Sequence, residues 1–319
     1  MKIYKSMEVK YFIALAVIFF ITFNLSGQSS TWIAIPNKPF NTGITMLDGI
    51  SCITWANGRF VVGGQLGMIA YSLNGLSWTM VQNSTFGENY VSDIAWGNNR
   101  FVAVGNNGKI AYSSDGVTWS GIQNSPFDNL IDCIAYGSGK FVAGGMDGGL
   151  AYSNDGITWN RVHNSSFGDI RILDIAYGNG RFVAVGQNGR MAYSSDGITW
   201  NRVQNSSFEN ANIRSIAYGN DRFVAVGHIG RIAYSSDGIT WTRVQNSMFL
   251  NSESIWEIAY GGGVFMAGGG EKLVQSYDGI TWTLISNRPF EDDFIDCIGW
   301  GNGIFLVSVF GGRLIFTNP

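Results

Sequence analysis

The sequence predicts an all-β protein, and its fold class is a seven-bladed β-propeller of four-stranded antiparallel blades. Three observations lead to this prediction: the composition favours strands, a repeat of about 41 residues fills the chain, and the two ends complement each other. Only 13% of the 319 residues are charged and 43 are glycine, while β-branched and aromatic residues are plentiful. This composition is typical of sheet proteins with many tight turns.

The repeat is clearest in the stretch SSDGITW at 194–200, which recurs letter for letter at 235–241. Two further markers, Asn-x-x-Phe and the Phe of RFVAVG, each occur seven times. The tryptophans of the SSDGITW box and its close copies are Trp78, Trp119, Trp159, Trp200, Trp241 and Trp282, spaced by 40 or 41 residues. A period of this length without helical pattern is typical of propeller blades. We therefore expect a single propeller domain over residues 28–319.

The N-terminal residues 1–27 predict a secretory signal peptide. Lys2, Lys5 and Lys10 precede an almost wholly apolar stretch at 12–25, and small or polar residues follow it. This apolar stretch is shorter than the roughly 20 residues that span a bilayer. We expect cleavage near Gly27, no stable membrane span afterwards, and a secreted, periplasmic or cell-surface protein. A retained anchor is the alternative, and the final compartment stays open.

One repeat unit, residues 171–208, predicts four strands joined by tight turns. In order, they are 172–178 (strand A), 181–186 (strand B), 190–195 (strand C) and 198–204 (strand D). The Asn-Gly pair at 179–180 is a strong signal for a two-residue hairpin turn. A looser segment then crosses to strand A of the next unit.

The two ends of the chain predict that the ring closes. The seventh unit stops at Pro319 after its strand C, whereas the stretch SSTWIAIPNKPF at 29–40 is a strand D without strands before it. We expect the N-terminal strand to complete the last blade. Closure of this kind removes the exposed strand edges that an open array would present.

The box resembles the Asp box of sialidases and related bacterial β-propellers, Ser-x-Asp-x-Gly-x-Thr-Trp, although Asp and Gly are adjacent here. Together with RFVAVG, it also resembles the repeat of photosystem II assembly factor-like propellers. From the residues alone, the Asp carboxylate would accept hydrogen bonds from its own turn, Gly would supply a positive φ, and Trp would pack between blades. We interpret the box aspartates as structural, and the resemblance implies the same: Asp115, Asp155, Asp196, Asp237 and Asp278.

Candidate ligand-binding residues lie where the units differ. In a propeller, the D-to-A crossings and the B–C turns surround one mouth of the central channel. The position after the first residue of strand A is uneven, and four of its residues mix carboxylates, a cation and an aromatic ring: Asp132, Arg214, Trp256 and Asp296. This mixture suits a protein or carbohydrate ligand. The alternative is a solvated position that tolerates any residue. The cysteines Cys52, Cys133 and Cys297 share the next position with Asp, Ser and Glu, and we expect them to be small fillers.

We predict an exported, non-catalytic binding propeller that is monomeric and recognises a protein or glycan at the crossing-loop face. The alternative is a divergent sialidase-like glycoside hydrolase, which would need three arginines converging with a carboxylate at the mouth; only Arg214 is placed there. His163 and His228 replace Gln or Asn of sister units, so no catalytic role is expected for them. No cofactor or metal site is predicted. The net charge of −3 without blocks of like charge gives no indication of nucleic-acid binding.

Overall fold

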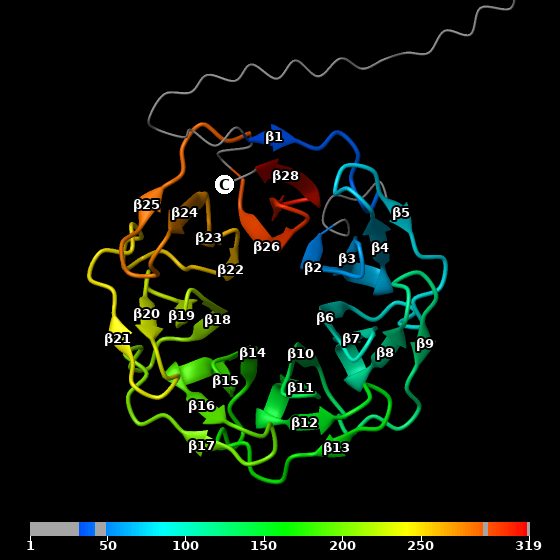
Figure 1. The fold of residues 1–319 in the computed structure, drawn as a ribbon, viewed down its shortest axis with the longest axis horizontal. Helices are drawn as coiled ribbons and strands as arrows, with labels where there is room; N and C mark the ends of the chain where they lie inside the picture. The colour runs from blue at the N-terminus through cyan, green and yellow to red at the C-terminus, as the bar shows by residue number, and fades with distance from the viewer. Residues whose placement is uncertain (1–31, 42–48, 290–292, 318–319) are drawn as a thin grey trace, which may run out of the picture. The chain divides into compact units, whose positions relative to one another are not determined.

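Seven four-stranded antiparallel sheets are arranged in a ring around a central channel (Figure 1). The structure is a computed structural model that describes residues 32–41, 49–289 and 293–317. The arrangement confirms the predicted fold class. The signal peptide predicted for residues 1–27 lies outside the described residues.

Each blade is a meander whose strands A, B, C and D follow one another from the channel outward. Blades 1 to 6 are β2–β5, β6–β9, β10–β13, β14–β17, β18–β21 and β22–β25, and blade 7 is β26, β27, β28 and β1. The A strands are β2 (Ile50–Ala56), β6 (Val91–Gly97), β10 (Ile131–Gly137), β14 (Ile172–Gly178), β18 (Ile213–Gly219), β22 (Glu257–Gly261) and β26 (Ile295–Gly301). The B strands are β3 (Arg59–Gly64), β7 (Arg100–Gly105), β11 (Lys140–Gly145), β15 (Arg181–Gly186), β19 (Arg222–Gly227), β23 (Val264–Gly269) and β27 (Ile304–Val309).

The outer strands are shorter. The C strands are β4 (Ile69–Ser72), β8 (Ile110–Ser113), β12 (Leu150–Ser153), β16 (Met191–Ser194), β20 (Ile232–Ser235), β24 (Lys272–Ser276) and β28 (Arg313–Thr317). The D strands are β5 (Thr79–Met80), β9 (Ser120–Gly121), β13 (Asn160–Arg161), β17 (Asn201–Arg202), β21 (Thr242–Arg243), β25 (Thr283–Leu284) and β1 (Ile33–Ala34). Single 3-10 turns form the B–C connections at 65–67, 106–108, 146–148 and 187–189.

Strand D is much shorter than the sequence predicted. In blade 4 the expected strand at 198–204 is reduced to Asn201–Arg202. The reason is that Ile198 and Thr199 donate their backbone N–H groups to the Asp196 carboxylate, at 2.8 and 2.7 Å, and not to strand C. The box turn therefore occupies the first part of the segment.

The N-terminal strand closes the ring as predicted. Strand β1 pairs antiparallel with β28, with Ile33 opposite Phe316, and β1 lies beside β28 in Figure 1. The flanking side chains Trp32 and Ile35 are buried. Phe40 packs with residues of blades 1 and 7 in one hydrophobic cluster. One blade is thus built from both ends of the chain.

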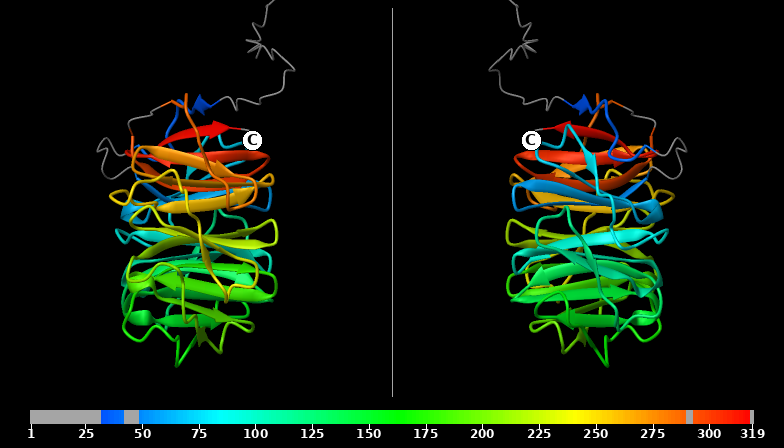
Figure 2. Two further views of the ribbon diagram at one scale, coloured as in Figure 1. Left: turned by 90° about the vertical axis from the view of Figure 1, so that its left-hand side faces the viewer. Right: turned by 90° about the vertical axis from the view of Figure 1, so that its right-hand side faces the viewer.

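The hydrophobic core lies between neighbouring blades. Val142 of blade 3 packs in one cluster with Ile172, Phe182 and Trp200 of blade 4, and equivalent clusters recur around the ring. Strand A of one blade approaches the next blade so closely that a Cβ on Gly178 would come within 2.0 Å of the Tyr218 ring. Seen from the side, the strands form a disc whose turns project from both faces (Figure 2).

The turns divide between two faces in the predicted way. On one face, the A–B turns of blades 1, 2, 4 and 5 donate hydrogen bonds to the box turn of the next blade. Arg100 Nη1 donates to the Asp155 carbonyl at 2.5 Å, and Asn57 Nδ2 donates to the Ser114 carbonyl at 3.4 Å. On the other face, the crossings contact the B–C turns. The predicted mouth therefore lies on the crossing face.

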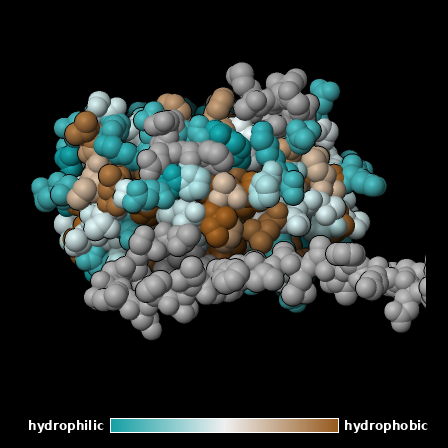
Figure 3. All heavy atoms as spheres, turned by 90° about the horizontal axis from the view of Figure 1, so that it is seen from above, coloured by the Kyte–Doolittle hydropathy of each residue, from teal (hydrophilic) through white to brown (hydrophobic). Residues whose placement is uncertain are grey.

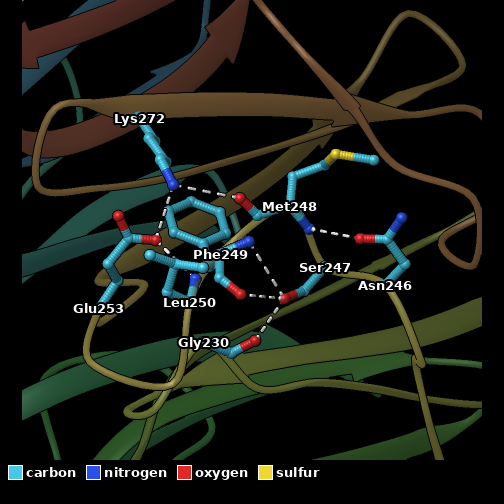
Figure 4. Close-up of polar contacts among 8 residues, drawn as sticks. All are labelled: Gly230, Asn246, Ser247, Met248, Phe249, Leu250, Glu253 and Lys272. Carbon is cyan, nitrogen blue, oxygen red and sulfur yellow. Dashed lines mark hydrogen bonds and ion pairs between the residues drawn. The ribbon is translucent and has the colours of Figure 1, made fainter.

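The Asn-x-x-Phe marker anchors the crossings at 83–86, 164–167, 205–208 and 246–249, as Figure 4 shows for the segment between blades 5 and 6. Asn246 Oδ1 accepts a hydrogen bond from the backbone N–H two residues further on, at 3.3 Å. Ser247 Oγ accepts from the Phe249 N–H at 3.3 Å and donates to the Gly230 carbonyl at 2.6 Å. The Lys272 ammonium lies 5.9 Å from the centroid of the Phe249 ring. The Ser247 contact holds the crossing against the B–C turn of blade 5, and Lys272 contacts it from strand β24 of blade 6.

The rim on the side of β1 and β28 is largely hydrophilic, with hydrophobic residues near its middle and toward the left side of the view (Figure 3). Among the described residues, the structure contains no helix with the length and apolar character needed to cross a membrane.

Candidate functional site at the channel mouth

A β-bulge at the start of strand A directs the candidate side chains to the mouth. In blade 3, Ile131 pairs with Gly145 but Cys133 pairs with Gly144, so Asp132 is an extra residue on its strand. The same register shift occurs in six of the seven blades. Bulged residues are freed from the regular alternation of side chains, which allows a side chain to be re-aimed. In blade 6, Trp256 directly precedes strand β22 instead of lying in it.

The mouth leads into a channel cavity of about 150 Å³. The bulge residues Asp132, Leu173 and Arg214 contribute to its wall, together with acidic residues of the next strand position. The cavity is therefore polar and lies where several blades converge.

Asp132 is held by an arginine that the sequence analysis did not single out. Arg171 Nε lies 2.7 Å from Asp132 Oδ2, and its Nη2 lies 2.5 Å from Oδ1. This two-point pair links blades 3 and 4 and is the geometry that guanidinium and carboxylate groups prefer. Burial raises the pKa of Asp132 above its ordinary value, although the hydrogen bonds from Arg171 oppose that shift.

Arg214 and Trp256 form a stacked pair beside this ion pair. The Arg214 guanidinium carbon lies 4.1 Å from the centroid of the Trp256 ring, and the His228 ring meets the indole edge-on at 5.6 Å. Trp256 is 38% exposed. The guanidinium has no hydrogen-bond acceptor among the described residues, so its N–H groups face the mouth without a protein partner. Burial lowers the pKa of Arg214, and the nearby Arg171 lowers it further.

His228 belongs to the same group but is neutral at neutral pH. Burial lowers its pKa, and the positive charge of Arg214 adds to the shift. The imidazole therefore acts here as an aromatic neighbour of the indole. The stack presents two rings and one cation toward the mouth.

Asp296 lies in a different pocket of the mouth, of about 260 Å³. Ser51, Gln65, Tyr90 and Phe310 line this pocket, and the Phe310 side chain is 49% exposed. Burial raises the pKa of Asp296 to about 6, and the charge of Asp293 contributes. Within the described part of the chain, the Asp296 carboxylate accepts no hydrogen bond and has no cation beside it.

Below the mouth, a second ring of acidic residues ties the A strands together. Asp93 Oδ1 accepts from the backbone N–H of Ile94 at 2.7 Å, and its Oδ2 accepts from Ile134 of the next blade at 2.8 Å. Asp174 bridges blades 4 and 5 in the same way. Such bridges satisfy N–H groups that line the channel.

Two carboxyl groups of this ring contact the same serine hydroxyl. Ser215 Oγ lies 2.8 Å from Asp174 Oδ2 and 2.8 Å from Glu257 Oε1. A hydroxyl has a single proton to donate, so one of these two contacts requires a carboxyl group that carries its own proton. Burial raises the pKa of Glu257 to about 8 and that of Asp93 to about 7, and the neighbouring carboxylates add to both shifts.

The three cysteines at this position are buried and unpaired. Burial is the main cause that raises the pKa of Cys52, Cys133 and Cys297, which keeps them as thiols. Among the described residues there is no group of three His, Cys, Asp or Glu side chains able to hold a metal ion.

The structure brings together three of the four predicted site residues, Asp132, Arg214 and Trp256, on one arc of the mouth, whereas Asp296 lies in its own pocket. Arg171 was not among the residues predicted from the sequence, and for His228 only a catalytic role was argued against. A signal for Arg171 did exist, because the residue before the opening Ile or Val is uneven too: Gly49, Tyr90, Leu130, Arg171, Asn212, Ser254 and Phe294.

The three-arginine arrangement of a sialidase-like site is not formed by the described residues. Arg171 and Arg214 lie at the mouth, and Arg171 is engaged by Asp132. Arg190 donates to the Ser166 carbonyl at 3.1 Å, in the crossing before its own blade. The mouth therefore offers one guanidinium group with unused donors.

Comparisons with known proteins extend to the fold alone. No family model and no curated protein matches the chain. A structure of YCF48 bound to D1 peptide has a TM-score of 0.72 at 16% identity, over 92% of this chain and 97% of that one. Catalytically inactive virginiamycin B lyase from Staphylococcus aureus with quinupristin has a TM-score of 0.72 at 13% identity, over 91% and 99% of the two chains. The structure of the RRP9 WD40 repeats has a TM-score of 0.68 at 10% identity, over 91% of this chain and 99% of that one. The chain is thus a seven-bladed propeller with a polar, aromatic mouth.

Proposed function

We propose that the protein is an exported binding propeller that holds a segment of a partner protein at the crossing-face mouth. The observation that carries this proposal is the Arg214–Trp256 stack: a 38% exposed indole under a guanidinium whose donors have no acceptor among the described residues. Arg and Trp are the residue types that most often anchor protein interfaces. Backbone carbonyls or a carboxylate of an extended segment would supply the missing acceptors.

A structural neighbour gives independent support at the level of the fold. The YCF48 structure is bound to D1 peptide, so a protein with a similar fold binds a peptide. Fold similarity does not transfer a site, which is why the proposal rests on the residues of this mouth.

The Asp132 side of the mouth favours binding over catalysis. Asp132 is occupied by a two-point contact with Arg171, which leaves it unsuited to take up or release a proton during a reaction. No specific observation favours the sialidase-like alternative. A glycan ligand remains an outcome of the test below.

The test is a selection from a random displayed-peptide library and a glycan array, both on residues 28–319. The best peptide is then titrated by calorimetry. We expect Arg214→Ala and Trp256→Ala each to weaken peptide binding at least tenfold. Tyr277→Ala is the matched control, since it removes a 64% exposed aromatic ring from a box turn on the opposite face. Selected ligands that bind both mouth variants unchanged would contradict the proposal, and glycan binding would change the ligand class.

Export is the second part of the proposal, and it follows from the N-terminal pattern of basic, apolar and small residues at 1–27. Mass spectrometry of the protein from its native host tests it. We expect a chain that begins near Gln28, and a chain that still begins at Met1 would contradict cleavage.

A further inference from the structure

The repeat offers an internal comparison for the Asp296 pocket. Asp132 and Asp296 occupy the same bulge position, in blades 3 and 7. In each case, the next blade contributes the residue that precedes the opening Ile of its strand A. For Asp132 this residue is Arg171, which pairs with it at two points. For Asp296 it is Gly49.

Among the described residues, no side chain takes the place beside Asp296 that Arg171 takes beside Asp132, because the equivalent residue is glycine. A Cβ built on Gly49 would have no atom within 4 Å, and its φ lies outside the left-handed region. The pocket of about 260 Å³ lies here, with Gly49 and Asp296 both in its wall. An unpaired carboxylate in a partly buried pocket costs free energy until a cation or donor reaches it.

We propose that the Asp296 pocket is a subsite for a guanidinium side chain of the partner protein, which takes the place that Arg171 occupies beside Asp132. The proposal rests on the proposed function and names the chemistry that one half of the mouth recognises. Tyr90 and Phe310 add aromatic walls, on which a planar guanidinium stacks favourably. A lysine ammonium would also be attracted, but it lacks the flat two-point geometry of an arginine.

The two halves of the mouth then select opposite charges. The Arg214 arc offers unused donors to an anionic or carbonyl group, and the Asp296 pocket offers an acceptor to a cationic one. A bound segment would therefore have a defined direction, with its arginine toward blades 7 and 1. Reversal would place like charges together, which disfavours the wrong orientation.

The test uses Nα-acetyl-arginine N-methylamide as the probe and its uncharged citrulline analogue as the ligand control, each titrated into residues 28–319 by NMR. We expect the arginine probe to bind in the millimolar range and the citrulline analogue at least tenfold more weakly. Asp296→Asn should reduce probe affinity at least tenfold. Asp169→Asn, an exposed aspartate on a crossing, is the matched control and should change nothing.

A second variant introduces an arginine of the protein itself beside Asp296. Gly49→Arg should occupy the pocket as Arg171 does beside Asp132, and it should block the probe, whereas Gly49→Ala should not. The affinity should also fall about tenfold from pH 7 to pH 5, because the carboxyl of Asp296, whose pKa is about 6, becomes protonated. The other polar groups facing it among the described residues are Ser51, Gln65, Tyr90 and Asp293, the last of which contacts Arg313.

Equal binding of the arginine probe to the wild-type and Asp296→Asn proteins would overturn this inference. So would equal binding of the arginine and citrulline probes. Neither result would affect the peptide test of Arg214 and Trp256, so failure of the subsite and failure of the proposed function can be told apart.

Discussion

The hydrogen bonds and ion pairs of each carboxylate in this channel depend on which groups the next blade places beside it. Asp93 receives a backbone N–H from Ile134, Asp132 receives a guanidinium, and Asp296 receives nothing within the described residues. The β-bulge that sets the backbone at these positions recurs in six of the seven blades. A repeat protein can therefore vary its chemistry by exchanging side chains at two adjacent positions without altering the ring.

The acidic ring below the mouth predicts an unusual dependence of stability on pH. Folding raises the pKa of Glu257 to about 8 and that of Asp93 to about 7, and it also raises the pKa of Asp174. Unfolded carboxyl groups titrate near pH 4, so between about pH 4 and 8 the folded state binds more protons. Stability therefore falls as the pH rises from about 4 to about 8.

Urea unfolding at pH 6 and pH 9 checks this prediction. We expect a lower free energy of unfolding at pH 9, and a weaker dependence in Glu257→Gln. Glu88→Gln, at an exposed position, is the matched control and should keep the full dependence. Stability that stays constant or increases from pH 6 to pH 9 would show that these carboxyl groups are ionised in the folded state.

The two kinds of tryptophan should respond differently to truncation. Trp200 is 5% exposed and packs between blades 3 and 4, so Trp200→Ala should cost about 3–5 kcal/mol. Trp256→Ala should cost clearly less, because 38% of that side chain is exposed, and should weaken ligand binding instead. Thermal melts of both variants, with a peptide titration on the second, decide the point. If Trp256→Ala loses more stability than Trp200→Ala and still binds the peptide normally, Trp256 is a core residue and not part of the binding site.

The sequence predicts the residues of the site better than their partners. Asp132, Arg214, Trp256 and Asp296 could be found because they vary at a position that the repeat defines. Arg171 lies 39 residues after Asp132, and their contact exists only because consecutive blades are adjacent at the channel. Pairing across blades is a property of the closed ring, and the sequence of one unit does not contain it.

At the scale of the blade, the box turn sets the length of strand D. Asp196 Oδ1 accepts two backbone N–H groups and the Ser194 hydroxyl, while Ser194 Oγ accepts the N–H of Gly197 at 2.9 Å. These are the turn contacts expected from the residue types. Strand D was predicted too long because alternation in ITWNRVQ cannot distinguish N–H groups bound to strand C from those bound to a carboxylate.

Blade 1 supplies a natural control for a test of the turn. Its box has Asn74 in place of Asp, and Asn74 Oδ1 still accepts the N–H groups of Leu76 and Ser77 at 2.9 and 3.0 Å. We expect Asp196→Ala to cost about 1 kcal/mol, since the lost acceptors are replaced in part by water. Asp196→Asn should reduce the free energy of unfolding by much less than Asp196→Ala, because the amide oxygen can still accept the two N–H groups. Chemical unfolding of both variants measures the difference, and equal losses would mean that the carboxylate charge, not the acceptor, stabilises the turn.

Across the whole molecule, contacts between neighbouring blades stabilise the ring on both faces and in the core. Arg100 reaches the Asp155 carbonyl of the next blade, Ser51 donates to the Val91 carbonyl at 2.5 Å, and the hydrophobic clusters combine residues of two blades.

The number of blades, the strand order and the closure were predictable because seven copies of one signal and two complementary ends leave little freedom. The ligand was not predictable, because it depends on positions that the repeat does not fix.

The stability of the whole ring is expected to depend on strand β1, which completes blade 7. Strand β1 supplies the outer edge of blade 7, and Trp32, Ile35 and Phe40 fill the core around it. Removal of residues 30–40 exposes the edge of β28 and opens part of the contact between blades 7 and 1. Because each blade is stabilised mainly by its neighbours, we expect residues 41–319 to lose cooperative unfolding or to aggregate.

Calorimetric melts and gel filtration of chains 30–319 and 41–319 measure the effect, with residues 28–319 as the parent. The chain that begins at residue 30 keeps β1 and should behave like the parent. If the chain that begins at residue 41 melts at the same temperature with the same enthalpy, blade 7 is stable with three strands and closure contributes little. A broadened transition in the 41–319 chain alone would assign the cooperativity of the whole ring to the segment that contains β1, through its pairing with β28 and its buried side chains Trp32, Ile35 and Phe40.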